Sequence, residues 1–343
     1  ISKTPSFLIM DFNQIISDLK NKIYKPIYFL SGDEPYFIDL ITKYIHDNVL
    51  SDAEKSFNQT VLYGKEAEIH TVINTAKRFP MMANYQVVIV KEAQNIKKIE
   101  DLIHYAENPL NSTLLVINYK YKTLDKRKKL YKAIQQKGVL FESKKLYENE
   151  VPSWINAYLK NRNRTIDPSA GMLLTEYLGT DLSKTANELD KLIITLPDGE
   201  FNITTNHIER NIGISKDYNN FELHKALTQK NVLKANRIVN YFSHNQKDNP
   251  FTLTISTLYH FYSKVLTYHF VKNKNDKRNV AATLKVNPYF VGDYEKAARN
   301  YNPKKTVEVI SLLREYDLKS KGYQNVSTSH GELLKELVYK ILH

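Results

Sequence analysis

Residues 25–141 alternate between short apolar segments and amphipathic helical patterns, and this alternation restricts the fold more than any other feature. The apolar segments have the length and composition of buried strands. They occupy residues 27–30, 61–63, 86–90, 113–118 and 138–141. The helical patterns occupy residues 37–49, 67–78, 96–106 and 126–136. Continuous apolar strands that alternate with helices predict a parallel sheet covered by helices on both faces.

The strand pattern almost disappears after residue 143, and helical patterns replace it. Proline, aspartate or glycine bounds these patterns, as expected at helix ends. They cover residues 152–159, 167–179, 181–196 and 204–213. From residue 218 onward the chain is predicted to be almost entirely helical, with breaks at residues 247–250, 287–288 and 302–303. We therefore expect three domains: an α/β domain (1–143), a small helical domain (144–212) and a larger helical domain (213–343).

Composition excludes several classes of protein. The chain has no cysteine, so disulfides and thiolate metal sites are impossible. No apolar run has the ~18 residues of a membrane helix, and we expect a cytoplasmic protein. The first nine residues have no signal-peptide layout, and Met10 is a more natural start than Ile1.

The net charge of +12 suits a polyanionic partner such as nucleic acid. Lysines scattered over solvated faces explain the same charge, because most of the basic residues are lysine. Charge alone therefore leaves direct nucleic-acid contact open.

The turn after the first strand, within "YFLSGDEPYFIDL", lies where many nucleotide-binding proteins hold phosphate. A phosphate-binding P-loop needs G-x-x-x-x-G-K-[ST], and only Gly32 is present. Pro35 removes one backbone donor. Asp33 and Glu34 place negative charge where a phosphate needs positive potential. These residues predict a degenerate nucleotide site.

The second nucleotide signature is also missing. A carboxylate that binds Mg²⁺ should follow the strand "VVIV", but Lys91 comes first and Glu92 second. The histidines are dispersed, and the sequence contains neither H-E-x-x-H nor G-x-S-x-G. We expect no catalytic residues, no metal and no cofactor.

One connection in the α/β domain is unusually apolar. Phe79, Pro80, Met81 and Met82 join a predicted helix to a predicted buried strand. Methionine adapts to partner pockets, and an exposed apolar cluster marks an interaction surface. The alternative is that this cluster folds back onto its own sheet.

Several stretches, in order along the chain, point to one family. They are "YFLSGDEPYFI", "FPMMANYQVVIV", "GTDLSKTANELDKL", "FELHKAL", "NPYFVGDYEKAARNY" and "LLREYDLKSKG". Each is weak alone, but together they resemble the delta subunit of bacterial DNA polymerase III over nearly the whole chain from Asp11. The resemblance implies a non-ATPase AAA+ protein with a RecA-like domain, a three-helix lid and a helical collar. The collar would join other loader subunits, and Phe221, Leu223 and Leu227 begin its apolar stripe.

The resemblance implies a clamp-loader subunit that binds and opens the ring-shaped sliding clamp, the beta subunit, in DNA replication. Its other partners would be gamma/tau-type and delta-prime-type subunits and primed DNA. The protein would be a component of the DNA polymerase (nucleotidyltransferase) holoenzyme and would catalyse no reaction itself. Phe79, Pro80, Met81 and Met82 match the family's clamp-binding element, which often presents leucine and phenylalanine where this chain has the two methionines. Two alternatives remain open: an active AAA+ ATPase or helicase-like motor, and a general basic nucleic-acid-binding protein.

A turn in the collar is a candidate DNA contact. Gly322 lets the chain leave the preceding helix, which places Tyr323 in a turn beside Lys319 and Lys321. An aromatic ring flanked by cations can stack on an exposed base. The alternative is that Tyr323 packs on its own helix as a local cap.

Overall fold

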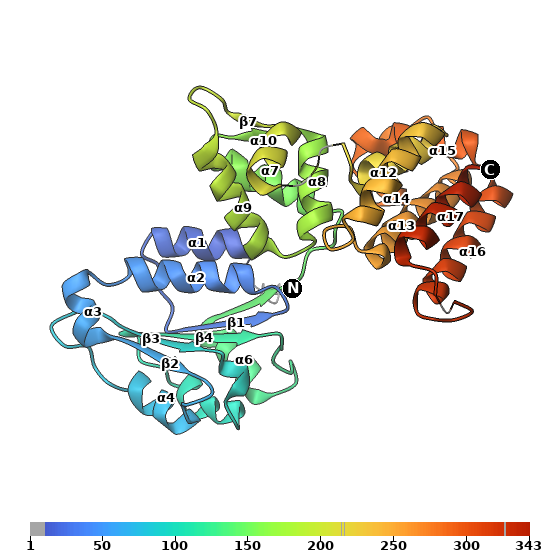
Figure 1. The fold of residues 1–343 in the computed structure, drawn as a ribbon. Helices are drawn as coiled ribbons and strands as arrows, with labels where there is room; N and C mark the ends of the chain where they lie inside the picture. Colours follow the sequence, from blue (N-terminus) through green and yellow to red (C-terminus); the bar gives the residue numbers. More distant parts are fainter. Residues whose placement is uncertain (1–10, 214, 216, 326) are drawn as a thin grey trace. The chain divides into compact units, whose positions relative to one another are not determined.

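The structure, a computed structural model, describes residues 11–213, 215, 217–325 and 327–343, so Met10 lies outside the described residues. The chain divides into two compact units (Figure 1), one ending at Leu146 and the other running from Tyr147 to His343. None of the described helices combines the length and the apolar character needed to cross a membrane.

The first unit contains a five-stranded sheet whose neighbouring strands are all parallel. Its strands are β1 Ile27–Gly32, β2 Gln59–Tyr63, β3 Gln86–Lys91, β4 Thr113–Lys120 and β5 Val139–Ser143. Their spatial order is β2-β3-β4-β1-β5. All five predicted strands are confirmed. The order places β1 beside β4 and β5, so the turn after β1 lies among the strand ends in the middle of the sheet.

Helices cover both faces of this sheet (Figure 1), because side chains alternate between faces along each strand. Tyr28 and Leu30 of β1 belong to one apolar cluster, together with residues of α1 (Phe12–Lys20) and α2 (Pro35–Asn48). Ile27 and Phe29 belong to the other, together with residues of α4 (Ile69–Ala76) and α6 (Lys129–Lys137). Both clusters are buried, as the continuous apolar strands predict.

Three segments of this unit differ from the sequence prediction. Helices α1 and α3 (Asp52–Asn58) were not predicted. The predicted helix 96–106 is wrong: the segment forms only the 3₁₀ turn η2 (Ile99–Leu102) and the four-residue α5 (Ile103–Ala106), after a separate turn η1 (Ala93–Asn95). Lys98 has a left-handed backbone, with φ of 56°, which an α-helix cannot contain.

The second unit is built from helices and one small sheet. The helices up to residue 212 are α7 Val151–Lys160, α8 Pro168–Leu178, α9 Leu182–Thr195 and α10 Thr205–Ile212. Two short parallel strands, β6 (Thr165–Ile166) and β7 (Asn202–Ile203), were not predicted. The remaining elements are α11 Asn220–Thr228, α12 Val232–His244, α13 Phe251–His269, α14 Lys277–Leu284, the 3₁₀ turn η3 Pro288–Phe290, α15 Val291–Asn300, α16 Pro303–Ser320 and α17 His330–Leu342.

The three breaks predicted among the later helices are confirmed, and further breaks occur at residues 229–231 and 270–276 and after Ser320. A large apolar core joins α11, α12, α13, α16 and α17. Leu223 and Leu227, from the predicted apolar stripe, are fully buried in this core. Phe221 is half-buried, and its ring lies edge-on to Phe290 with 5.4 Å between centroids. These side chains stabilise the unit itself.

Candidate functional site

The connection between α4 and β3 presents apolar side chains to solvent. Phe79 and Met81 are 74% and 63% exposed, and Met82 is completely exposed, while Pro80 is half-buried. The cluster therefore does not fold back onto its own sheet. We call residues 79–82 the apolar loop.

Buried polar side chains fix the backbone within the apolar loop and just before it. The side chain of Asn58, at the end of α3, accepts a hydrogen bond from the Met81 N–H at 2.6 Å and donates one to the Met81 carbonyl at 2.9 Å. The side chain of Gln86 donates to the carbonyls of Ala76, at 3.2 Å, and of Arg78. Asn58 and Gln86 are almost completely buried. The exposed side chains therefore stand on a fixed backbone.

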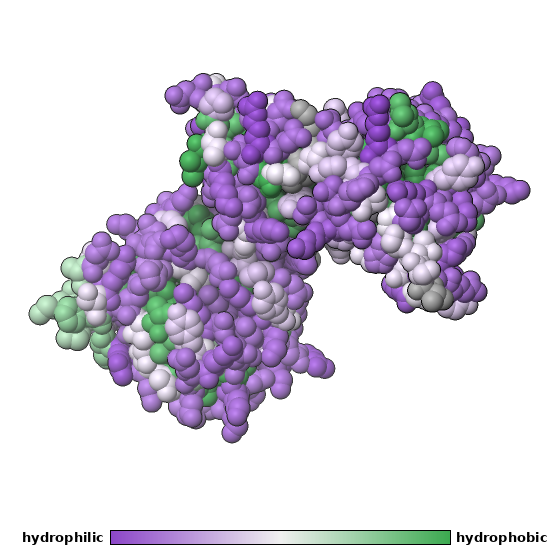
Figure 2. All heavy atoms as spheres, in the orientation of Figure 1, coloured by the Kyte–Doolittle hydropathy of each residue, from purple (hydrophilic) through white to green (hydrophobic). Residues whose placement is uncertain are grey.

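A further exposed aromatic residue is the sequence neighbour of Asn58. Phe57 precedes Asn58 on α3 and is 73% exposed. Apolar side chains gather at the end of the unit that carries α3 (Figure 2). Neither Phe57 nor Asn58 was predicted as a site residue. A signal was present: Ser51 and Glu54 form a capping box, which marks the start of a helix that would carry both residues.

The turn after β1 uses its own backbone donors internally. The Gly32 N–H donates to the Lys122 carbonyl at 3.0 Å, and the Glu34 N–H donates to the Ser143 carbonyl at 3.3 Å. Gly32 has φ of 116°, and a Cβ there would lie 2.1 Å from the Ser143 oxygen, so only glycine fits.

The N-terminus of α2 is also capped by the protein. The Glu34 carboxylate accepts a hydrogen bond from the Tyr36 N–H at 3.0 Å, and Pro35 has no N–H to offer. Asp33 is exposed beside it. A phosphate at this helix end would meet a buried carboxylate in place of free amides.

Strand β3 ends in the cation of Lys91, whose Nζ lies 5.9 Å from the centre of the Tyr63 ring on the edge strand β2. Glu92 follows in a left-handed turn, with φ of 52°, and accepts a hydrogen bond from the Asn95 side chain at 3.4 Å. Within the described part of the chain, no three His, Cys, Asp or Glu side chains are placed to hold a metal ion.

The turn after α16 is the third predicted site. Gly322 has φ of 92°, and Tyr323 is 61% exposed. The two lysines are not free beside it: Lys319 pairs with Glu315 and Lys321 pairs with Asp317, each at 2.6 Å. Tyr323 is available for stacking, while both cations are engaged along their own helix.

Sequence comparison identifies the family. Residues 28–144 match the family model described as "DNA polymerase III, delta subunit", and residues 217–335 match the model of its C-terminal domain. The DNA polymerase III subunit delta of Bacillus subtilis (strain 168) is 26% identical over 313 residues, which cover 88% of this chain and 90% of that protein.

Structural comparison agrees with this result. A solved structure of the Bacillus subtilis DNA clamp loader delta protein matches with a TM-score of 0.54 and 23% identity. The match covers 97% of this chain and 99% of that one. It confirms the predicted fold class, a RecA-like AAA+ α/β domain followed by helical domains. Taken together, the two family models and the whole-length match show that this chain belongs to the family of DNA polymerase III delta subunits.

Proposed function

We propose that this subunit binds and opens a ring-shaped sliding clamp within a clamp loader, without hydrolysing ATP itself. The apolar loop is the proposed clamp-binding element, with Phe79, Pro80, Met81 and Met82 as its contact residues. Gamma/tau-type and delta-prime-type subunits, together with primed DNA, are the proposed further partners. The domain at residues 213–343 is the proposed region for assembly with those subunits.

The exposure of the apolar loop on a fixed backbone is the observation that carries this proposal. Free apolar side chains gain binding energy when a partner pocket removes them from water. The hydrogen bonds from Asn58 hold the Met81 backbone before any partner arrives, so little backbone entropy is lost on binding. A rigid apolar protrusion is therefore suited to enter a preformed pocket.

Opening requires more than binding. The loop shifts the clamp toward its open form only if it binds that form more tightly than the closed one. A shift from about 1% to about 99% open needs roughly 5.5 kcal/mol of differential affinity. A well-buried anchor residue contributes ~2 kcal/mol or more. Three or four apolar anchors supply energy of this order if they are buried in the open clamp and not in the closed one.

The turn after β1 supports the absence of ATP hydrolysis. Its Gly32 and Glu34 amides donate to Lys122 and Ser143, and the Glu34 carboxylate occupies the start of α2. These contacts remove the backbone donors that a triphosphate needs and add negative charge in their place. The same contacts argue against the alternative of an active AAA+ motor.

The main test is binding of the sliding clamp from the same organism to the protein and to its Met81→Ala/Met82→Ala variant. We expect a loss of roughly tenfold or more in affinity by calorimetry, because two buried anchors are truncated. Ile194→Ala on α9 is the matched control, since Ile194 is also an exposed aliphatic residue, at 82%. Unchanged affinity in the double variant would refute the assignment of the clamp-binding element.

A nucleotide titration tests the second part of the proposal. A ligand at 100 times its dissociation constant stabilises a folded protein by about 2.7 kcal/mol. We expect 1 mM Mg·ATP to leave the free energy of unfolding of the isolated subunit unchanged. A saturable increase would instead favour the ATPase alternative.

A further inference from the structure

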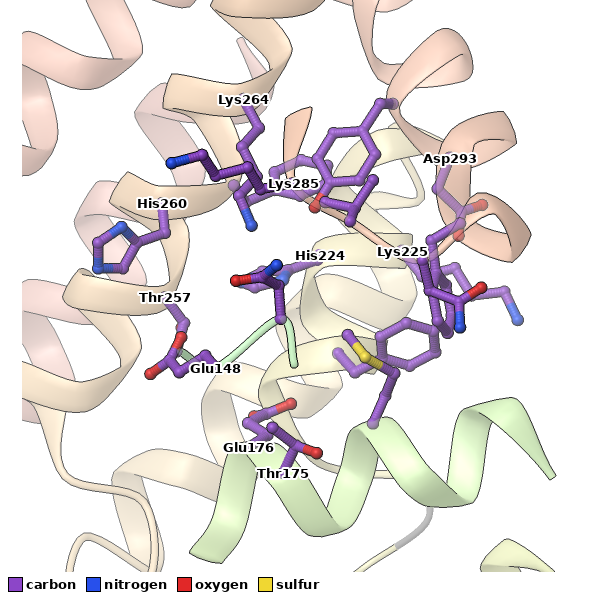
Figure 3. A pocket seen from close by; sticks show the side chains of 18 of the residues that line it. Glu148, Thr175, Glu176, His224, Lys225, Thr257, His260, Lys264, Lys285 and Asp293 are labelled. Atoms are coloured by element: carbon purple, nitrogen blue, oxygen red, sulfur yellow. The ribbon is translucent and has the colours of Figure 1, made fainter. Parts of the chain in front are cut away.

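A cavity of about 200 Å³ lies within the second unit, between α8, α11, α13 and the turn η3 (Figure 3). The delta-subunit family and the proposed clamp-binding element leave it unexplained. An engineered protein cavity of about 150 Å³ holds benzene, so this one has room for an aromatic ring with a small substituent.

Aromatic side chains form much of the cavity wall. The His224 ring stacks on Phe261, with 5.0 Å between centroids and 18° between planes. Phe221 and Phe290 meet edge to face, and Tyr294 lies 5.3 Å from Phe261. Such walls favour an aromatic guest, because rings gain from stacked and edge-on contacts.

Among the residues that the structure describes, two buried polar atoms of the lining have no hydrogen-bond partner: Nε2 of His224 and Oγ1 of Thr228. A shielded polar atom without a partner destabilises the protein, and a ligand that supplies the partner recovers that energy. Thr228 Oγ1 can donate a proton, and so can His224 in the tautomer protonated at Nε2. Figure 3 shows His224 in the middle of the cavity.

The lining also holds a partly buried cation. The Lys264 ammonium forms no ion pair in the described part of the chain, although Lys225 of the same lining lies 3.9 Å from Glu222. Burial lowers the pKa of Lys264, and the charge of Glu148 opposes this effect. Figure 3 shows Lys264 and Lys285 on one side of His224 and Glu176 on the other.

Two of the acidic residues of the lining, Glu176 and Glu148, are engaged or solvated. The Glu176 carboxylate accepts a hydrogen bond from the Asn220 N–H at 3.0 Å, at the start of α11. Glu148 is exposed to water. Burial raises the pKa of Asp293, and the charges of Lys296 and Lys225 oppose this effect. Within the described part of the chain, the buried lining atoms without a hydrogen bond are thus those of His224 and Thr228, and Lys264 is a partly buried cation without an ion pair.

We propose that this cavity binds a small aromatic monoanion, with the ring against Phe261 and Phe290 and the carboxylate at Lys264, His224 and Thr228. A carboxylate fits this set because it accepts hydrogen bonds at both oxygens and carries one charge. A ring without charge would leave Lys264 unpaired.

Benzoate is the probe, and benzamide is its neutral counterpart of similar shape. Ligand-observed NMR on the full chain should show saturable benzoate binding, roughly tenfold tighter than benzamide, because a charge-assisted hydrogen bond is lost in the amide. Lys264→Met should reduce benzoate affinity roughly tenfold, and Lys264→Arg should largely retain it. Thr228→Val, which keeps the shape of the side chain, should weaken benzoate roughly threefold.

Lys335→Met on α17 is the control, because Lys335 already pairs with Glu332 at 2.8 Å outside the cavity lining. It should leave benzoate affinity unchanged. Circular dichroism verifies that each variant is folded. Absence of saturable benzoate binding overturns the proposal, and so does binding that Lys264→Met leaves intact, since benzoate would then occupy another surface.

Discussion

The side chain of Asn58 makes hydrogen bonds to both backbone polar groups of Met81, 23 residues later in the sequence. Its amide group reproduces the donor and acceptor of a neighbouring strand, and it also donates to the Glu54 carbonyl at 3.2 Å. One buried side chain thus joins the end of α3 to the centre of the apolar loop. The consequence is that the exposed methionines depend on a residue that is itself almost completely buried.

Replacement of Asn58 by alanine should therefore weaken clamp binding although every apolar contact residue remains. The Met81 groups would bond to water, and the loop would sample other conformations that binding must then restrict. We expect roughly a tenfold loss of clamp affinity, and a fall of ~1–3 kcal/mol in the free energy of unfolding. Calorimetry with the clamp and urea denaturation measure the two effects.

Asn48→Ala is the matched control for this variant. The Asn48 side chain donates to the Tyr44 carbonyl at 2.9 Å on the exposed end of α2, so its loss leaves the apolar loop intact. Clamp affinity in Asn48→Ala should equal that of the parent. If Asn58→Ala binds the clamp as tightly as the parent protein does, the apolar loop does not need the hydrogen bonds from Asn58.

Phe57 should act as an additional anchor for the clamp. It is 73% exposed and precedes Asn58, which bonds to Met81. Phe57→Ala should reduce clamp affinity roughly tenfold and leave stability unchanged, since the ring contributes little to the folded core. Phe270→Ala is the matched control, because it removes an aromatic ring from the second unit at a residue that is also 73% exposed. If the two variants bind the clamp equally well, Phe57 lies outside the interface.

The sequence predicts the sheet correctly because strand burial leaves a strong local signal. Val87, Val88, Ile89 and Val90 are all completely buried, and such a run has few alternatives to a central parallel strand. The failure at residues 96–106 has a local cause as well. The apolar spacing there suits a helix, but Lys98 adopts a left-handed backbone that spacing does not report.

Only part of the candidate site can be predicted from the sequence: the apolar loop can, but its support by Asn58 cannot. The apolar loop stands out in the sequence because Met81 and Met82 occupy a connection. Its support by Asn58 is a contact across 23 residues, which no local pattern encodes. The pairing of Lys319 with Glu315 is local, at a spacing of four on one helix, and could have been anticipated.

Glu176 should make stability depend on pH. Burial raises the pKa of its carboxyl from 4.5 to about 7, and the charge of Glu148 adds to this, against hydrogen bonds from Asn220 and Phe221. The folded protein then holds a proton that the unfolded chain has lost, between about pH 4.5 and 7. The resulting stabilisation is complete below about pH 4.5 and disappears as the pH rises through about 7.

Glu176→Gln removes this titration and keeps an oxygen to accept from the Asn220 N–H. Relative to the variant, the parent should lose up to ~3 kcal/mol of stability between pH 4.5 and 8, measured by urea denaturation. Burial also lowers the pKa of His224 to about 3, which has the opposite pH dependence but is present in both proteins. Glu308→Gln, on the exposed side of α16, should show no such difference. If the free energies of unfolding of the parent and of Glu176→Gln differ by the same amount at every pH, the Glu176 carboxyl is not the source of the pH dependence.

Tyr323 is the proposed DNA contact of the collar, and its surroundings define what kind of contact it can make. Its N–H donates to the Leu318 carbonyl at 3.1 Å, so the turn is fixed while the ring is exposed. Base stacking contributes ~1–3 kcal/mol, so Tyr323→Ala should reduce the primed-DNA affinity of the assembled loader roughly five- to a hundredfold. Tyr323→Phe should retain it.

The salt dependence separates stacking by Tyr323 from phosphate binding by its neighbours. Lys319 and Lys321 are engaged by Glu315 and Asp317, so we expect neither to release a counterion on binding. The slope of log affinity against log salt should therefore be the same for Tyr323→Ala, Lys321→Met and the parent loader. A smaller slope in Lys321→Met would show that the lysine leaves Asp317 to bind phosphate. Parent-like DNA affinity in Tyr323→Ala at matched salt would leave the tyrosine with a purely structural role.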